Sequence, residues 1–219
     1  MANQRNRRAK HLVLFDLDGV LLDSRENMRR SWQKVCEEFG TKVSFEQYFN
    51  EIGRPFSAIM ERLGLSERGG EIEATFRVAS MDNFDVLKFY PHVPETLRQL
   101  EAAGLKMGIV TSKDQLRTNA ILAMLPVTFS CVHAPDGKMR GKPAPDHLLM
   151  AMAQTAVDPI DTLYVGDMAA DFEAAQRAGI DYAHAEWGYG RAPAGDCWKL
   201  SGMRDLLELI PAGKKREAS

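Results

Sequence analysis

The sequence predicts an α/β protein: a core with a doubly wound parallel sheet, and a small helical bundle inserted into it. Three observations lead to this prediction. Short apolar runs recur along the 219 residues, segments of helical periodicity separate most of them, and residues 24–88 show helical periodicity without a strong strand. Strands that alternate with helices form parallel sheets, so the runs outside residues 24–88 are expected to share one layered core.

The expected strands are short and apolar. Leu12–Phe15 is followed by aspartate and glycine residues and fits a strand buried on both faces, as in a parallel sheet. Similar runs occur at Lys106–Val110, Val127–Val132 and Thr162–Val165, and a weaker one at Asp181–Ala185. These five runs predict the strands of the core.

Helical patterns lie between several of these runs. Pro94–Ala103 has leucines on one face and is followed by Gly104, where a C-terminal cap would lie. Asp146–Ala156 also has an apolar face, and Asp167–Ala178 is rich in alanine and closed by Gly179. These segments are expected to cover the sheet.

The inserted segment has a different pattern. Apolar residues at helical spacing predict helices about Trp32–Phe39 and Phe56–Leu63, and Glu71–Val86 is expected to form a longer helix. Together they predict a small helical bundle.

The domain boundaries follow from this bundle. Residues 24–88 are expected to form the cap, and residues 1–23 and 89–219 the core. The edges near Asp23–Arg25 and Phe89–Pro91 are expected to act as hinges.

Composition excludes several classes of partner. Hydrophobic residues make up 45% of the chain and charged residues 26%, and the net charge is −2. This is ordinary globular composition with no basic field for nucleic acid or a membrane surface. No apolar run reaches membrane-spanning length, and Asp16 interrupts the first one too early for a secretory signal.

The cysteines point to a reducing compartment. The chain has three, an odd number without metal-ligand spacing, at Cys36, Cys131 and Cys197. They are expected to be free thiols, which predicts a cytoplasmic protein.

Two carboxylates end the first predicted strand, in the motif Asp16-Leu17-Asp18-Gly19. Ligands of α/β sheets bind beyond the carboxyl ends of the strands. Residues two apart project to roughly the same side, and Gly19 lets the backbone turn away. Taken alone, the motif is as often a turn or a fragment of a calcium loop as a catalytic pair.

Hydroxyl side chains follow the strand Lys106–Val110. Thr111 could donate to a phosphate oxygen, with Ser112 and backbone N–H groups adding further bonds. Taken alone, an ordinary helix N-cap explains this pair better.

A single lysine lies in the stiff segment Gly141-Lys142-Pro143-Ala144-Pro145. Pro143 restricts Lys142 to extended backbone. A fixed ammonium suits a phosphate or a charged nucleophile, although a surface lysine before a helix is the commoner case.

Two more carboxylates, Asp167 and Asp171, follow the strand Thr162–Val165. Four residues apart, they can share a helix face. Capping of the helix and binding of a hard cation such as Mg²⁺ explain this pair equally well.

In combination, the four motifs indicate a functional site more strongly than any of them does alone, because each lies beyond a predicted strand and therefore at the same edge of the sheet. The residues gathered there are Asp16, Asp18, Thr111, Lys142, Asp167 and Asp171. Four carboxylates in one pocket repel one another strongly unless a divalent cation lies between them. The set therefore predicts a site for Mg²⁺ and a phosphoryl group.

In these motifs the chain resembles the haloacid dehalogenase superfamily, in its branch similar to phosphoglycolate phosphatases. The resemblance rests on residues 15–24, 109–113, 141–145 and 166–171, which occur in the order of the family. Segments 90–97 and 187–190 are also similar, so nearly the whole chain is covered.

The resemblance implies a Rossmann-like core with a helical cap inserted after the first motif. It also implies a Mg²⁺-dependent phosphatase that acts on a small phosphorylated metabolite. In such enzymes the residue matching Asp16 attacks phosphorus and forms an aspartyl phosphate, and the one matching Asp18 is the general acid and base. Thr111 and Lys142 would hold the phosphate and the nucleophile.

The resemblance also implies the metal set and the substrate contacts. The metal set is Asp16, Asp18 through its backbone carbonyl, and Asp167, with Asp171 supporting it. Gly19 and Ser112 would contact the phosphate, and Arg54 in the cap would meet the rest of the substrate. A monomer or a homodimer is expected.

Other activities remain open. Phosphomutases similar to β-phosphoglucomutase share all four motifs, so the core cannot separate them from phosphatases. Dehalogenases lack a residue like Asp18, and phosphonatase-like members use a cap lysine that is absent from Gly53–Met60. A non-catalytic binding module on the same fold predicts damaged motifs, whereas all four are intact.

Overall fold

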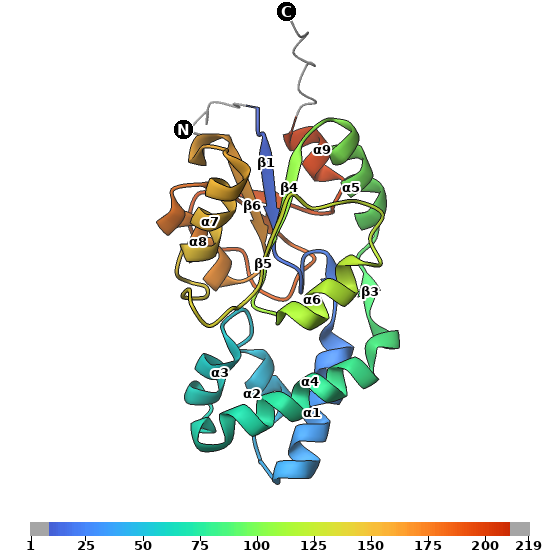
Figure 1. Ribbon diagram of the computed structural model, residues 1–219, viewed down its shortest axis with the longest axis vertical. Helices are drawn as coiled ribbons and strands as arrows, with labels where there is room; N and C mark the ends of the chain where they lie inside the picture. Colours follow the sequence, from blue (N-terminus) through green and yellow to red (C-terminus); the bar gives the residue numbers. More distant parts are fainter. Residues whose placement is uncertain (1–8, 211–219) are drawn as a thin grey trace, which may run out of the picture.

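The computed structural model describes residues 9–210 as a parallel sheet flanked by helices, with a separate group of helices beyond one end of the sheet (Figure 1). The six strands lie in the order β5-β4-β1-β6-β7-β8, and every pair is parallel. Their bounds are Leu12–Phe15 for β1, Lys106–Val110 for β4, Cys131–His133 for β5, Thr162–Gly166 for β6, Asp181–Ala185 for β7 and Trp198–Leu200 for β8. The predicted fold class is confirmed.

Both faces of the sheet are apolar, as a central parallel strand requires. In β1, Val13 and Phe15 belong to one buried cluster, whereas Leu12 and Leu14 belong to another on the opposite face. The first cluster packs against α5 (Val93–Ala102), α6 (Gln115–Leu122) and α9 (Asp205–Leu209). The second packs against α7 (Asp146–Thr155) and α8 (Ala169–Ala178).

The group of helices beyond the sheet has its own apolar cluster, which includes Trp32, Tyr48 and Phe76. Its members are α1 (Arg25–Phe39), α2 (Phe45–Phe49), α3 (Phe56–Arg62) and α4 (Gly69–Asp82). In Figure 1 these helices lie beyond the ends to which the strand arrows point. The helices therefore face the carboxyl edge of the sheet. The exact division at residues 24–88 stays a prediction.

Short elements complete the chain. Strands β2 (Leu22–Asp23) and β3 (Lys88–Phe89) pair antiparallel where the chain leaves and re-enters the core, close to the expected hinges. Three 3₁₀ turns span Ser66–Arg68, Phe84–Val86 and Pro159–Asp161. Within residues 9–210, no helix combines the length and apolar character needed to cross a membrane.

One predicted strand was too long. Residues 127–130 are not part of β5. The N–H of Thr128 donates to the carboxylate of Glu101 (3.1 Å), and the first backbone bond to β4 runs from the N–H of Ser130 to the carbonyl of Met107 (2.7 Å), next to the pair Cys131–Gly108. This segment is also partly exposed. Val127 and Phe129 therefore pack against the core at the rim of the sheet without forming ladder bonds of their own.

Helix boundaries also differ from the predicted ones. The helix expected at Glu71–Val86 ends at Asp82 and continues as a 3₁₀ turn, and the one expected from Asp167 begins at Ala169 because Met168 is still extended (φ −107°, ψ 157°). Strand β8 and helices α6 and α9 were not predicted, since each is short and weakly periodic.

Candidate active site

The predicted site residues come together at the carboxyl edge of the sheet. Asp16 directly follows β1, Thr111 follows β4 and Asp167 follows β6, and these three strands are neighbours. Lys142 reaches the same place from the loop before α7, and Asp171 from the first turn of α8. Sequence segments that lie far apart thus contribute to one buried group.

Three carboxylates form the centre of this group. Asp16 is 4% exposed, Asp167 and Asp171 are fully buried, and each offers an oxygen within 4.8 Å of the other two. Oδ2 of Asp171 accepts the backbone N–H groups of Asp167 (3.2 Å) and Met168 (2.9 Å). Asp171 therefore fixes the turn that carries Asp167.

The ammonium of Lys142 lies among these carboxylates. Its Nζ is 2.7 Å from Oδ1 of Asp171 and 3.1 Å from Oδ1 of Asp16, and it also contacts the hydroxyl of Tyr164 at 3.2 Å. Burial alone would lower the pKa of Lys142, but the two carboxylates outweigh it and raise that pKa above its usual range. Lys142 is therefore a fixed buried cation.

One cation does not neutralise three carboxylates. Burial raises the pKa of Asp16 to about 7, although Lys142 pulls it down. Burial and the charge of Asp171 raise the pKa of Asp167 well above its ordinary value. Oδ1 of Asp167 is buried and has no hydrogen-bond partner among the described residues.

These properties fit a hard divalent cation. An all-oxygen donor set suits Mg²⁺, and a buried carboxylate oxygen without a partner is the group that such an ion would satisfy. The two oxygens of Asp171 already accept protein donors. Among the three carboxylates, Asp16 and Asp167 are thus the freer ligands.

Glycines allow the chain to pass close to Asp167. Gly19 has φ +83°, and a Cβ there would lie 2.2 Å from Oδ2 of Asp167. A Cβ at Gly188 would lie 2.3 Å from Cβ of Asp167. The next residue, Tyr189, donates its N–H to Oδ2 of Asp167 at 2.7 Å. Gly19 therefore lies directly beside the carboxylate cluster.

The side chain of Asp18 lies outside this cluster of three. Its Oδ1 accepts the hydroxyl of Ser24 (2.6 Å) and is 3.1 Å from Nζ of Lys113. The hydroxyl of Tyr189 contacts Ser24 in turn, accepting the N–H of that residue at 2.7 Å. Asp18 is thus held toward the pocket by a separate set of partners.

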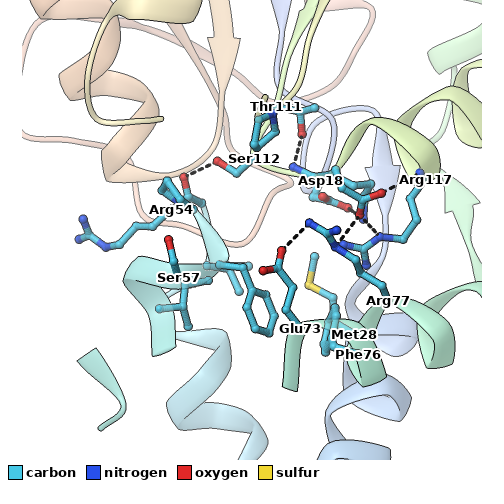
Figure 2. Close-up of a pocket in the computed structure, with 18 of the residues that line it drawn as sticks. Asp18, Met28, Arg54, Ser57, Glu73, Phe76, Arg77, Thr111, Ser112 and Arg117 are labelled. Atoms are coloured by element: carbon cyan, nitrogen blue, oxygen red, sulfur yellow. Dashed lines mark hydrogen bonds and ion pairs between the residues drawn. The ribbon is translucent and has the colours of Figure 1, made fainter. Parts of the chain in front are cut away.

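Thr111 and Ser112 occupy the turn after β4. Thr111 is buried, and its hydroxyl accepts the N–H of Lys113 at 3.2 Å. The hydroxyl of Ser112 donates to the carbonyl of Gly53 at 3.0 Å, which joins the core to the loop before α3 (Figure 2). Ser112 is therefore a contact between the sheet edge and the inserted helices.

A pocket of about 160 Å³ lies between the sheet edge and the inserted helices. Its lining includes Asp16, Asp18 and Thr111 from the core, and Arg54 and Arg77 from the other side. In Figure 2 the guanidinium of Arg54 extends away from Asp18, and its Nε lies 3.7 Å from Oε2 of Glu51. Arg54 lines the pocket without reaching its centre.

Four further residues shape the site. Lys113 and Ser24 hold Asp18, Tyr164 contacts Lys142, and Tyr189 contacts both Ser24 and Asp167. Lys113 and Ser24 lie inside the motifs that contain Thr111 and Asp16, so the sequence already indicated that they lie near the site. Tyr189 lies in the similar segment 187–190, but neither its contacts nor those of Tyr164 could be predicted, because they depend on how the strands and loops pack.

Comparison with known proteins agrees with this geometry. The family of haloacid dehalogenase-like hydrolases matches residues 13–185. A phosphoglycolate phosphatase of Aquifex aeolicus is 32% identical over 208 residues, covering 91% of this chain and 96% of its own. An N-acetylmuramic acid 6-phosphate phosphatase of Pseudomonas aeruginosa is 31% identical over 186 residues, covering 81% and 82%.

Solved structures have the same fold. A protein of Lactobacillus plantarum, described as a candidate phosphoglycolate phosphatase, superposes with a TM-score of 0.84 at 24% identity, covering 92% of this chain and 100% of its own. A candidate β-phosphoglucomutase of Bacteroides vulgatus gives 0.76 at 26% identity, covering 92% and 89%. With its motifs gathered at one sheet edge and a match over most of its length, the chain belongs to the haloacid dehalogenase-like hydrolases.

Proposed function

We propose that this protein is a Mg²⁺-dependent phosphatase that hydrolyses a small phosphomonoester through a phosphorylated Asp16. The observation that carries the proposal is the buried group of Asp16, Asp167 and Asp171 around Lys142, which opens onto a small pocket. Phosphoryl transfer needs positioned charge more than any other catalytic device.

Asp16 is the proposed nucleophile. Its backbone is fixed at the end of β1 by an N–H bond to the carbonyl of Val165 (2.9 Å), and its Oδ1 accepts the N–H of Leu17 (2.7 Å). Attack of a carboxylate oxygen on phosphorus releases the alcohol and forms an acyl phosphate, which divides one difficult step into two easier ones. Lys142, 3.1 Å away, favours the ionised carboxylate that this step needs.

Asp16, Asp167 and the backbone carbonyl of Asp18 would hold the metal ion, and Asp171 would support them through its bonds to the turn at Asp167. When bound, Mg²⁺ would offset the negative charge of the carboxylates and of the phosphoryl oxygens.

Asp18 is the proposed general acid and base. It would give a proton to the departing alcohol oxygen and then accept one from the water that cleaves the acyl phosphate. Ser24 and Lys113 orient its carboxylate toward the pocket. Thr111 would donate its hydroxyl to a phosphoryl oxygen, since it lies on the neighbouring strand end.

The pocket limits the substrate to a small molecule. We propose that Gly19 and Ser112 approach the phosphate and that Arg54 borders the remainder of the substrate. The named activities of the two phosphatase relatives support a small phosphorylated metabolite. A cytoplasmic monomer or homodimer, with residues 24–88 as a cap that closes over the core, completes the proposal.

The test is a phosphate-release assay on p-nitrophenyl phosphate and a panel of phosphorylated metabolites, with Mg²⁺ and with EDTA. We expect EDTA to stop turnover, and Asp16→Asn to lower kcat by at least about a thousandfold while circular dichroism stays unchanged. Asp82→Asn, an exposed carboxylate on α4, is the control and should retain wild-type turnover. Full activity in Asp16→Asn would reject the nucleophile, and full activity in EDTA would reject the metal.

A phosphomutase is the second candidate, favoured by the β-phosphoglucomutase-like neighbour. The two differ in where the phosphate goes, so the same assay on sugar monophosphates separates them. A phosphatase releases inorganic phosphate, whereas a mutase yields an isomeric sugar phosphate and little free phosphate.

A further inference from the structure

The hydroxyl of Tyr48 is a polar group without a partner at the pocket. Tyr48 is 3% exposed and lines the pocket from α2. Its ring stacks on Trp32, with centroids 4.4 Å apart and planes 11° apart, and also packs against Phe76 at 5.4 Å. Among the described residues its hydroxyl makes no hydrogen bond, and it is not one of their fully enclosed unpartnered atoms, so the hydroxyl is accessible from the pocket that Tyr48 lines.

The surroundings of this hydroxyl belong to the pocket. Burial raises the pKa of Tyr48, the cation of Arg117 lowers it, and the carboxylates of Asp18 and Glu73 raise it further. Arg117, Asp18 and Glu73 all line the pocket. The phenol thus lies within electrostatic reach of the groups that surround a bound substrate.

The cations of the pocket, in contrast, all have partners. Lys113 lies 3.1 Å from Asp18, and Arg117 contacts Asp114, the N-cap of α6. Arg77 contacts Glu73 and lies 3.7 Å from the same Asp114.

Arg54 is likewise paired with Glu51. Within the described part of the chain, the pocket therefore offers an unpaired hydroxyl but no cation without a carboxylate beside it. Beside each of these cations, a carboxylate on the substrate would meet a protein carboxylate that already offsets the positive charge and repels a second anion.

We infer that Tyr48 determines specificity by hydrogen bonding to a substrate whose leaving group is uncharged and bears hydroxyls. This inference rests on the proposed phosphatase activity and specifies the class of its substrate. The alcohol that departs would carry hydroxyls that meet the phenol of Tyr48. It would lack a second anionic group, and in this it would differ from the acid-bearing alcohols in the named substrates of the two phosphatase relatives. A site built to bond a hydroxyl discriminates strongly against analogues without it.

The test uses three phosphomonoesters of equal chain length: sorbitol 6-phosphate, 6-phosphogluconate and hexyl phosphate. The second replaces a terminal hydroxymethyl group with a carboxylate, and the third removes the hydroxyls. We expect kcat/KM for sorbitol 6-phosphate to exceed that of each analogue by at least about tenfold. Tyr48→Phe keeps the ring and its stacking, and should reduce the preference for sorbitol 6-phosphate over hexyl phosphate by about tenfold.

Tyr182→Phe is the matched control, because it removes another buried phenol hydroxyl from a different apolar cluster, where Tyr182 packs against Phe172. It should leave both ratios unchanged. A preference for 6-phosphogluconate would overturn the inference, as would hydrolysis of p-nitrophenyl phosphate with none of the three esters accepted. An equal loss on all three esters in Tyr48→Phe, or no loss, would also overturn it. Absence of phosphate release from every compound would instead reject the proposed phosphatase.

Discussion

The two sides of the pocket both carry many charges, but they balance them differently. At the sheet edge, Asp16, Asp167 and Asp171 are buried around the single cation of Lys142. On the side of the inserted helices, partly exposed arginines are matched with carboxylates, as Arg77 is with Glu73. The first arrangement is incomplete without further positive charge, whereas the second is already neutralised.

This difference separates two tasks. An excess of buried negative charge costs free energy of folding and is tolerated where a cation binds, which supports the proposal that this edge is the catalytic centre. Neutral ion pairs near solvent cost little and can be arranged in many ways. The core thus fixes the chemistry, and the inserted helices are free to vary what enters the pocket.

The largest effect is expected from Lys142→Met, which removes the one cation among the three carboxylates and keeps most of the side-chain volume. Breaking a buried pair leaves a charge uncompensated, at a cost of about 3–5 kcal/mol. We expect the free energy of unfolding, measured by urea denaturation without metal at pH 8, to fall by that amount.

The same measurement has a defined pH dependence. The pKa of Asp16 in the folded protein, about 7, lies above its ordinary value of 3.8. Between these values the folded state holds a proton that the unfolded state has lost, so stability rises as pH falls from about 7 toward 4. The loss caused by Lys142→Met should therefore be smaller at pH 5.5 than at pH 8.

The control for this variant is Arg68→Ala, which breaks an exposed pair with Glu71 and should cost less than about 1 kcal/mol. Equal effects of Lys142→Met and Arg68→Ala would contradict the view that the buried carboxylates depend on Lys142 more than an exposed ion pair depends on its cation.

An intermediate effect is expected from metal binding. At a Mg²⁺ concentration about 100 times its dissociation constant, a site present only in the folded state adds about 2.7 kcal/mol of stability. We expect thermal unfolding of the wild type to shift upward with Mg²⁺ and that of Asp167→Asn to lose the shift, because the unpartnered oxygen is then an amide atom. If Mg²⁺ still raised the unfolding temperature of Asp167→Asn, the ion would have to bind somewhere other than the sheet edge.

The sequence predicted the sheet edge better than the side facing it, and the reason is physical. Asp16, Thr111 and Asp167 each follow a central strand, and the ends of parallel strands meet wherever the sheet forms. Their proximity therefore needs only the strand assignments. The strands β1, β4 and β7 have the predicted bounds, so the catalytic edge was accessible from local patterns.

The other side depends on packing between elements that have no fixed relation in sequence. From the sequence, Tyr48 is indistinguishable from the other aromatic residues that form the core of a helical bundle. Only the folded structure shows that it lines the pocket, within electrostatic reach of Arg117. Arg54 also lines the pocket, and nothing in the sequence indicates that its guanidinium extends away from Asp18 (Figure 2). Likewise, the apolar pattern of residues 127–130 predicted a strand, because the neighbouring sequence does not indicate the hydrogen bond from Thr128 to the distant Glu101.

The smallest effect is expected from Arg54→Ala, which tests the side of the pocket formed by the inserted helices, where each arginine already has a carboxylate partner. Arg54 is one-third exposed and shares Glu51 with Arg62, so its loss is partly compensated. We expect the ratio of kcat/KM between a metabolite substrate and p-nitrophenyl phosphate to change by no more than about fivefold, the size of one surface ion pair. Arg62→Ala is the matched control, since Arg62 contacts the same carboxylate but does not line the pocket, and it should leave the ratio unchanged. If Arg54→Ala instead lowered turnover of every substrate a hundredfold, this side of the pocket would take part in the chemistry, and the division of tasks between core and inserted helices would be wrong.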